Sequence, residues 1–504
     1  MRQFAQSDPH VFDLYVRGSV PKVLEGSLIV AASRRNKDKS VFSRWHDSQA
    51  DLFRIDLSAG KPGRIRAHLL TTDPSGKDIG VSNPHGYLTQ PNHGINVQGN
   101  SVWVTNLLFG APLEIDLKQW KPRRVLRYVE TDADRPQLSG TSHFAWSLDN
   151  RYAYFHQSLL EKESDSNDVR AAQLRLIEMD TKTLGERVWE IVPPPDDPAL
   201  ETANFHSAFY FEEAGRGYVG LLRTGARLET LAPHNDSREH MVRPMPASTI
   251  WIVEIDRAAS TLKASTLPDV EQLGGLALSH LDVDSSGGNG FVLFANYKQA
   301  DVAEETHGKN IYGENPEEIR EQYSGMTVEA LNYGMVIRYE RRDGRTSLRT
   351  FSRPYDPGNT SQGHSWLPIN IEIDSSGQHL FCTFSGFRPR LLPRHVAKAY
   401  PGLTVKPSAI RYVPPLLLRF NASTLEVDHD RKRGHLSYAE PIAMTVVGNK
   451  AESYVCTFSP EIGLRVYPAD DLSSMVCHAV APEFMNWGET HFRPDPAHMQ
   501  FTER

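Results

Sequence analysis

Residues 141–155 read TSHFAWSLDNRYAYF, and this stretch contains the pattern that decides the fold. A histidine stands beside an apolar residue, a short strand pattern follows, and an Asp-Asn pair separates it from a second strand pattern. Asp-Asn and Asp-x-x-Gly favour tight turns, so the stretch predicts a β-hairpin that begins at a histidine. The same order of features returns in PNHGINVQGNSVWVTN (91–106), ANFHSAFYFEEAGRGYVGLL (203–222), LSHLDVDSSGGNGFVLFANY (278–297), QGHSWLPINIEIDSSGQHLFCTF (362–384) and GETHFRPDP (488–496).

A second repeated feature is a short apolar or alternating run that a polar turn residue closes. It occurs seven times, and a further strand pattern follows it, as in KPRRVLRYVE or STLKASTL. A blade of four antiparallel strands needs about 40–50 residues, so 504 residues accommodate seven blades with insertions. The sequence therefore predicts an all-β, seven-bladed β-propeller, because a pair of β-sandwiches would not require seven equivalent strand ends. The closing residues are Asp56, Asp116, Asp180, Asp256, Glu340, Asn421 and Asp470.

We expect residues 1–504 to form one propeller domain with two insertions outside the blade rhythm. Residues 298–334 and 385–415 are predicted to cap one face and to shape a substrate tunnel, and 301–334 has a helical pattern. The second insertion is basic and carries apolar side chains. This composition suits a peripheral membrane contact and equally a cap segment packed on the propeller. Its apolar residues are Leu391, Leu392, Val396, Tyr400 and Leu403.

Composition restricts the function classes. The net charge is −7 with scattered Lys and Arg, which argues against a nucleic-acid partner. No stretch approaches the roughly 18 consecutive apolar residues of a spanning helix. Cys382, Cys456 and Cys477 have neither metal-ligand nor disulfide spacing, which is typical of a reducing compartment. With no basic-then-apolar signal pattern at the N-terminus, we expect a cytoplasmic protein, and the sequence names no protein partner.

The histidines of the first repeat indicate a metal site. The first strand of a propeller blade lines the central channel, so histidines at the starts of several such strands converge on one point. An imidazole shell without carboxylates suits Fe, Zn, Cu or Ni rather than Mg or Ca. The remaining histidines, His68 and His156 among them, stand in polar or turn-like contexts and are predicted to be surface residues.

Several motifs resemble those of the carotenoid cleavage oxygenases in order and spacing along nearly the whole chain. They include YVRGSVPKVLEGSLIVAASRRN (15–36), FHSAFYFEE (205–213), AEPIAMTV (439–446) and VAPEFMNWGETHF (480–492). The resemblance implies a non-haem Fe(II) enzyme, with Fe(2+) as cofactor, that uses O2 to cleave a carbon–carbon double bond. Its partners would be O2 and a small apolar conjugated substrate, apocarotenoid-like or stilbene-like. The iron-binding, catalytic histidines would be His143, His206, His280 and His491.

The departures from the family pattern concern the residues around the ligands. The family orients three histidines with glutamates, which fix the ring and raise its basicity. Glu440 of the Gly-Glu-Pro-like motif matches one of them, whereas Leu108 and Trp366 stand where the others would be. His364, two residues before Trp366, is a candidate substitute. His93 stands where the family places a threonine beside the open coordination position, and is a candidate fifth ligand or hydrogen-bond donor.

Two other functions stay open at the level of sequence. PNHGINVQGNSVWVTN (91–106) also resembles a repeat of metal-dependent propeller lyases and lactonases, whose sites mix carboxylate or amide ligands with few histidines. A non-catalytic scaffold would bind proteins on its rim and would have no reason to place histidines at the axis.

Overall fold

The computed structural model describes most of the strands and leaves out many of the connections between them. The described residues are 10–36, 49–72, 92–106, 113–125, 138–140, 143–162, 169–196, 205–223, 249–268, 277–285, 289–302, 327–328, 330–351, 367–385, 404–405, 416–432, 443–459, 463–480 and 492–503.

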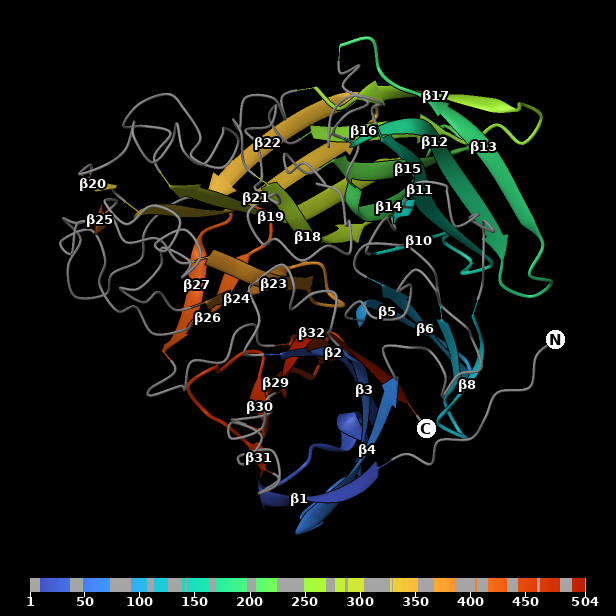
Figure 1. Cartoon of the computed structure of the whole chain (residues 1–504). Coiled ribbons are helices and arrows are strands. Elements are labelled where there is room, and N and C mark those ends of the chain that lie inside the picture. The colour runs from blue at the N-terminus through green and yellow to red at the C-terminus, as the bar shows by residue number, and fades with distance from the viewer. Residues whose placement is uncertain are drawn as a thin grey trace.

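Seven four-stranded antiparallel sheets follow one another around the molecule in chain order (Figure 1). Their first strands lie side by side at the centre: β32 beside β5 and β28, β14 beside β10 and β18, and β23 beside β18 and β28. The predicted seven-bladed propeller is therefore confirmed. From the innermost to the outermost strand, blade 1 is β32 (Phe492–Glu503), β2 (Gly26–Asn36), β3 (Gln49–Leu57) and β4 (Arg64–Thr72); blade 2 is β5 (Asn92–Gln98), β6 (Ser101–Asn106), β7 (Leu113–Asp116) and β8 (Lys121–Val125); blade 3 is β10 (Ala145–Trp146), β11 (Tyr152–Lys162), β12 (Val169–Asp180) and β13 (Glu186–Val192); blade 4 is β14 (Phe205–Glu213), β15 (Arg216–Arg223), β16 (Thr249–Glu254) and β17 (Thr261–Thr266); blade 5 is β18 (Ala277–Asp284), β19 (Gly290–Val302), β21 (Ala330–Arg342) and β22 (Arg345–Phe351); blade 6 is β23 (Leu367–Ile373), β24 (His379–Ser385), β26 (Leu416–Asn421) and β27 (Val427–Lys432); blade 7 is β28 (Ala443–Gly448), β29 (Ser453–Ser459), β30 (Gly463–Pro468) and β31 (Cys477–Val480).

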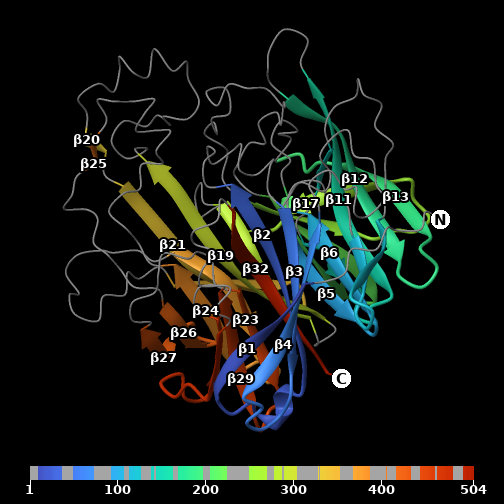
Figure 2. The ribbon, with the colours of Figure 1, turned by 60° about the horizontal axis from the view of Figure 1, so that its bottom comes forward.

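Three pairings close and reinforce the ring. The C-terminal strand β32 completes blade 1 by pairing with β2, which ties the two ends of the chain together (Figure 2). Strand β1 (His10–Gly18) lies between the outermost strands β31 and β4 and joins blades 7 and 1 into one sheet. Blades 3 and 4 are joined by parallel pairing of β13 with β17. A short 3-10 helix, η1 (Lys22–Leu24), precedes β2, and β9 (Leu138–Gly140) pairs with β11.

The core consists of apolar layers between neighbouring blades. Each pair of adjacent blades encloses its own cluster of buried side chains in the described residues. Strands in these layers are buried on both faces, which explains continuous apolar runs such as TIWIVE in β16. This double burial confines polar side chains to the turns, to the channel and to a few paired positions between blades.

The polar residues that end the third strands shape the turns to the fourth strands. Asp116, Asp180 and Asn421 each accept the backbone N–H of the residue four positions later and also accept turn N–H groups with their side chains. The fourth residue is left-handed in all three turns, at φ 53°, 62° and 57°. All seven predicted closing residues lie at or just after the third strand of a blade. This repeat is therefore a turn signal for the propeller.

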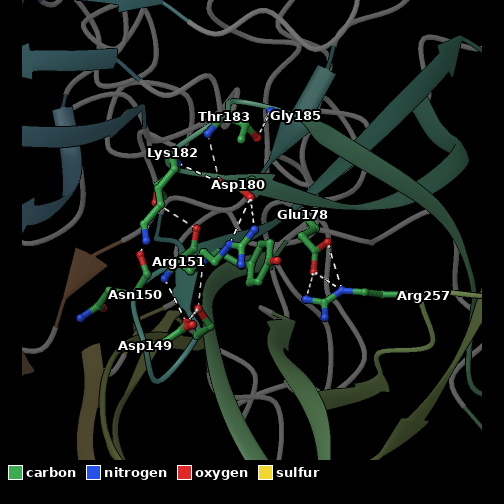
Figure 3. A network of polar contacts seen from close by, with 12 residues as sticks. Asp149, Asn150, Arg151, Glu178, Asp180, Lys182, Thr183, Gly185 and Arg257 are labelled. Atoms are coloured by element: carbon green, nitrogen blue, oxygen red, sulfur yellow. Dashed lines mark hydrogen bonds and ion pairs between the residues drawn. The ribbon is translucent and has the colours of Figure 1, made fainter.

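Between blades 3 and 4, polar groups from both blades meet near the parallel β13–β17 pair (Figure 3). Arg257, which follows β16, contacts Glu178 of β12 at 2.7 Å, and the Tyr154 hydroxyl donates to the same carboxylate at 2.7 Å. Arg151 contacts Asp180 at 3.0 Å within blade 3. The first of these contacts links the two blades directly.

The two predicted insertions meet through a small parallel ladder. Strand β20 (Thr327–Val328) belongs to the first insertion and pairs with β25 (Thr404–Val405) of the second, at the edge of the molecule (Figures 1 and 2). The helical prediction for 301–334 is wrong wherever the structure describes it, because 301–302 and 330–334 extend the β19–β21 hairpin. Cross-strand pairing overrides the local helical pattern there. Within the described residues no helix is long and apolar enough to cross a membrane.

Candidate metal centre

The predicted ligand histidines stand where the innermost strands begin. His206 lies in β14, His280 in β18 and His93 in β5, and His143 lies two residues before β10. His491 directly precedes β32 in the sequence. The side chain of His143 is described, whereas for the three histidines in strands the structure describes only the backbone. His491, His364 and Glu440 lie outside the described residues.

The pairing of the innermost strand becomes irregular at three of these histidines, His93, His206 and His280. In β14, Phe205 and Ser207 pair with consecutive residues of β15, so His206 is one residue too many. In β18 two residues, one of them His280, lie opposite a single residue of β19. In β5 two residues, one of them His93, lie opposite a single residue of β6. Extra residues of this kind bend a strand and re-aim a side chain, and they are frequent next to active sites. The same distortion at three histidines in three blades indicates a shared role.

Threonine hydroxyls on the second strands accept hydrogen bonds from backbone N–H groups at these irregular positions. The Thr105 hydroxyl on β6 accepts the N–H of Gly94, next to His93, at 2.9 Å. In blade 6 the Thr383 hydroxyl on β24 accepts the N–H of Asn370 at 3.1 Å, beside the irregular position of β23. A buried N–H without an acceptor is costly, so these hydroxyls stabilise the distorted backbone.

His143 is in the protonation state that a metal ligand requires. Burial lowers the pKa of His143 to about 3, because the apolar surroundings disfavour the imidazolium. Its neighbour Phe144 stacks on Phe155 of β11, with ring centroids 4.6 Å apart. The imidazole is therefore neutral at physiological pH and able to coordinate a metal.

The prediction that His156 is a surface residue is wrong. Its side chain on β11 is 0% exposed, and its ring lies edge-on to Phe205 at 4.3 Å between centroids. Ala153, Tyr154, Phe155 and Gln157 of β11 are also buried, so this strand is covered on both faces and its alternation gives no signal for His156. His68 is also largely buried and pairs with Asp56 at 3.0 Å.

Further along the innermost strands, polar side chains link one blade to the next. Asp282 accepts a backbone N–H of β23 at 2.7 Å, Glu372 accepts the Thr445 hydroxyl at 3.0 Å, and Gln500 accepts a backbone N–H of β5 at 3.0 Å. Burial raises the pKa of Asp282 and of Glu372, and their mutual repulsion raises that of Glu372 further. A cavity of about 370 Å³ lies beside Glu372, Thr445 and Gln500. No pattern in the sequence indicates this acidic part of the channel.

Among the side chains that the structure describes, no group of three or more His, Cys, Asp or Glu is placed to hold a metal ion. The three cysteines are buried and form no disulfide.

Comparison with known proteins finds a similar fold at low sequence identity. No family model and no curated protein matches the chain. A point mutant of the apocarotenoid oxygenase of Synechocystis aligns with 99% of this chain and 97% of its own, with a TM-score of 0.56 and 11% identity. The chain has the carotenoid cleavage oxygenase fold. A cobalt-substituted form of the same oxygenase gives a TM-score of 0.55 at 11% identity, and an ACO/RPE65 chimera gives 0.53 at 10%, with the same coverage.

The predicted resemblance is thus confirmed at the level of the fold. One of these structures, the cobalt-substituted Synechocystis apocarotenoid oxygenase, holds cobalt. In this chain the candidate donors are histidines at equivalent starts of innermost strands, and the one described side chain among them, His143, is a half-buried imidazole whose lowered pKa keeps it neutral. Neutral imidazole is the donor that Fe, Zn, Cu and Ni prefer, so the residues present fit a transition metal.

Proposed function

We propose that the protein is a non-haem Fe(II) dioxygenase that cleaves a carbon–carbon double bond of an elongated, apolar, conjugated substrate to give two carbonyl products. The single observation that carries the proposal is the distorted start of three innermost strands at His93, His206 and His280, together with the half-buried, neutral His143. The fold of the apocarotenoid oxygenase structures supports the choice of bond.

His143, His206, His280 and His491 would hold the metal, and Glu440 and His364 would orient the ligands. When bound, Fe(II) supplies the redox chemistry that activates O2 towards the alkene. In the balanced reaction both atoms of O2 are added, the C=C bond is broken and two C=O bonds form, so no proton is gained or lost. A ligand such as His143, which stays neutral over the physiological range, suits a reaction that needs no acid or base.

The first test measures metal content. Protein purified without added metal is loaded anaerobically with Fe(II), and the wild type should bind one ion per chain. Alanine at any one of His143, His206, His280 or His491 should abolish stable binding. His379→Ala is the control, because His379 lies on β24 and bonds to Asp374 at 3.1 Å. Full iron content in two or more of the four variants would contradict the ligand assignment.

The second test separates the reaction classes. The loaded enzyme is incubated with apocarotenoids and stilbenoids under air and under nitrogen, and aldehyde or ketone products should form only under air. Products that form equally well without O2 would indicate a metal-dependent lyase or lactonase instead. Binding of protein partners without any turnover or metal would indicate a scaffold.

We also propose that the insertions at 298–334 and 385–415 guide the apolar substrate and contact a membrane surface. The β20–β25 ladder supports this, because it brings the two insertions together at the edge of the molecule (Figures 1 and 2). Sedimentation with neutral and anionic vesicles tests the contact, and a protein that stays in the supernatant with both would contradict it.

A further inference from the structure

The hairpin of the two outer strands of blade 5 carries arginines on one of its faces. Strands β21 and β22 pair without interruption up to the turn at Asp343 and Gly344 (Figure 1). Residues directly opposite each other on antiparallel strands lie on the same face, and every second residue along a strand shares that face. One face therefore carries three opposed pairs, which are Arg338 with Arg349, Glu340 with Ser347, and Arg342 with Arg345.

This register places positive charges directly across from each other. Opposed like charges destabilise an antiparallel pair, and two such pairs flank the single carboxylate of Glu340 here. Glu340 already contacts Arg338 at 2.8 Å and Arg342 at 3.2 Å. Arg345 and Arg349 are exposed, and neither has a carboxylate partner in the part of the chain that the structure describes. The face therefore carries positive charge that its own carboxylate does not neutralise.

The same face is hollowed at the turn of the hairpin. A hollow of about 560 Å³ is lined by Arg342 and Arg345, by the exposed Ser347, and by Glu340 and Asp343. A guanidinium group presents a planar fork of N–H donors that matches two oxygens of a phosphate, and a hydroxyl adds a further donor. The hollow therefore offers the donors that a tetrahedral oxyanion requires.

The two carboxylates of the hollow restrict the kind of anion. Glu340 is held by two arginines, whereas Asp343 adds a negative charge at the turn, where its φ is 50°. A densely charged polyanion would be repelled there. A small ligand with one phosphate group and with hydroxyl groups fits both charges, because a carboxylate accepts hydrogen bonds from hydroxyls.

The turn end of the hairpin lies far from the two insertions. Strand β21 starts at Ala330, shortly after β20, and ends at Arg342. At about 3.3 Å per residue, the length of this strand separates the hollow from the β20–β25 ladder by about 40 Å. Because the insertions carry the proposed membrane contact, this position favours a soluble ligand over a lipid headgroup.

We propose that the hollow at the β21–β22 turn binds the phosphate group of a phosphomonoester through Arg342, Arg345 and Ser347. The site contains none of the predicted metal ligands, so it goes beyond the proposed function, and its test needs neither metal nor O2. A bound phosphate also offsets the repulsion between the opposed arginines.

The experiment is a calorimetric titration of the full chain with inorganic phosphate and with glycerol 3-phosphate, and with glycerol as the uncharged blank. The wild type should bind both anions and not glycerol. Arg345→Gln should weaken binding by about 10-fold or more, because it removes charged donors to the phosphate. Arg345→Lys keeps the charge but not the fork, so its affinity should lie between the two. Asp343→Asn should tighten the binding of inorganic phosphate a few fold, because it removes a repelling carboxylate.

Arg216→Gln is the matched control. Arg216 is 64% exposed on β15 of blade 4, so this variant removes the same charge from the surface of a neighbouring blade. It should leave the affinity for phosphate unchanged. Equal weakening in Arg216→Gln and Arg345→Gln would overturn the site, because it would indicate non-specific attraction. A wild type that binds neither anion nor vesicles would also overturn it.

Sedimentation with phosphatidylcholine vesicles that contain phosphatidic acid distinguishes the two sources of a phosphomonoester. Binding of glycerol 3-phosphate without sedimentation supports the site with a soluble ligand. Sedimentation that is lost in Arg345→Gln and kept in Arg216→Gln supports the site with a lipid headgroup.

Discussion

Replacing Tyr154 or Arg257 tests the polar link between blades 3 and 4. Glu178 is 6% exposed and accepts hydrogen bonds from two side chains: from the Tyr154 hydroxyl at 2.7 Å, and from Arg257 at 2.7 Å through Nη2 and at 3.2 and 3.3 Å through Nε. Tyr154 also stacks on Tyr210 of blade 4, with ring centroids 5.4 Å apart. Burial and the hydrogen bond to Glu178 raise the pKa of Tyr154, so the phenol stays protonated and donates.

The expected magnitudes follow from burial. Tyr154→Phe removes one hydrogen bond to a buried carboxylate and should lower the free energy of unfolding by about 2 kcal/mol. Breaking a fully buried ion pair costs about 3–5 kcal/mol, but Arg257 is 47% exposed and water can reach the carboxylate once it is removed. Arg257→Ala should therefore cost only about 2 kcal/mol. Because both residues act on Glu178, the double variant should deviate from additivity by about 1 kcal/mol.

Urea unfolding is the appropriate assay, with hydrogen exchange of β16 and β17 as a local readout. In a chain of 504 residues a loss of 2 kcal/mol shifts the melting temperature by only about 2 °C, since the unfolding entropy scales with length. Arg216→Ala is the control, because its pair with Glu254 is exposed on both sides and should contribute at most about 1 kcal/mol. A loss below 0.5 kcal/mol in Tyr154→Phe, or the same loss in the control as in Arg257→Ala, would refute the reasoning.

Three further variants test the channel, the ligand shell and the turns. Because folding raises the pKa of Glu372, the stability of the wild type should fall as pH rises above about 4.5, the pKa of this carboxyl in the unfolded chain. Glu372→Gln should therefore be more stable than the wild type at pH 7 and equally stable below pH 4. Unfolding measured across this pH range checks both expectations. Glu440→Gln should weaken iron binding or turnover by about 10–100-fold with unchanged circular dichroism, and unchanged iron content and rate would make Glu440 a structural residue. Gly463→Ala should lower the free energy of unfolding by about 3 kcal/mol, because φ is 80° and a Cβ would lie 2.1 Å from a backbone oxygen. Gly344→Ala is the control, since φ is 72° but the space around a Cβ is open, and it should lower the free energy of unfolding by about 1 kcal/mol. Equal losses in the two variants would contradict the clash at Gly463.

Much of the propeller could be predicted because its signals are local. Asp116, Asp180 and Asn421 shape their turns through bonds to residues two to four positions later, so sequence alone shows them. The histidines at or before the first strands of blades 1 to 6 could be found for the same reason. The choice of His143, His206, His280 and His491 as the ligand set rests on the family resemblance and stays a prediction.

The burial of His156 could not be predicted reliably, because it depends on a neighbouring blade rather than on its own strand. Phe205, which covers its ring, is 49 positions away in the sequence. The acidic part of the channel could not be predicted for a related reason, since Asp282 and Glu372 come together only when blades 5 and 6 are placed side by side.

Sequence by itself determined the class of fold, the number of blades and the strand that each histidine begins, since alternation and turn chemistry act over a few residues. Tertiary structure decided the rest. The extra residue at His206 exists only relative to the strand paired with it, and the joining of blades 3 and 4 by β13 and β17 needs two strands that are 69 residues apart to meet. Register and contact between blades are long-range properties, and no local pattern specifies them.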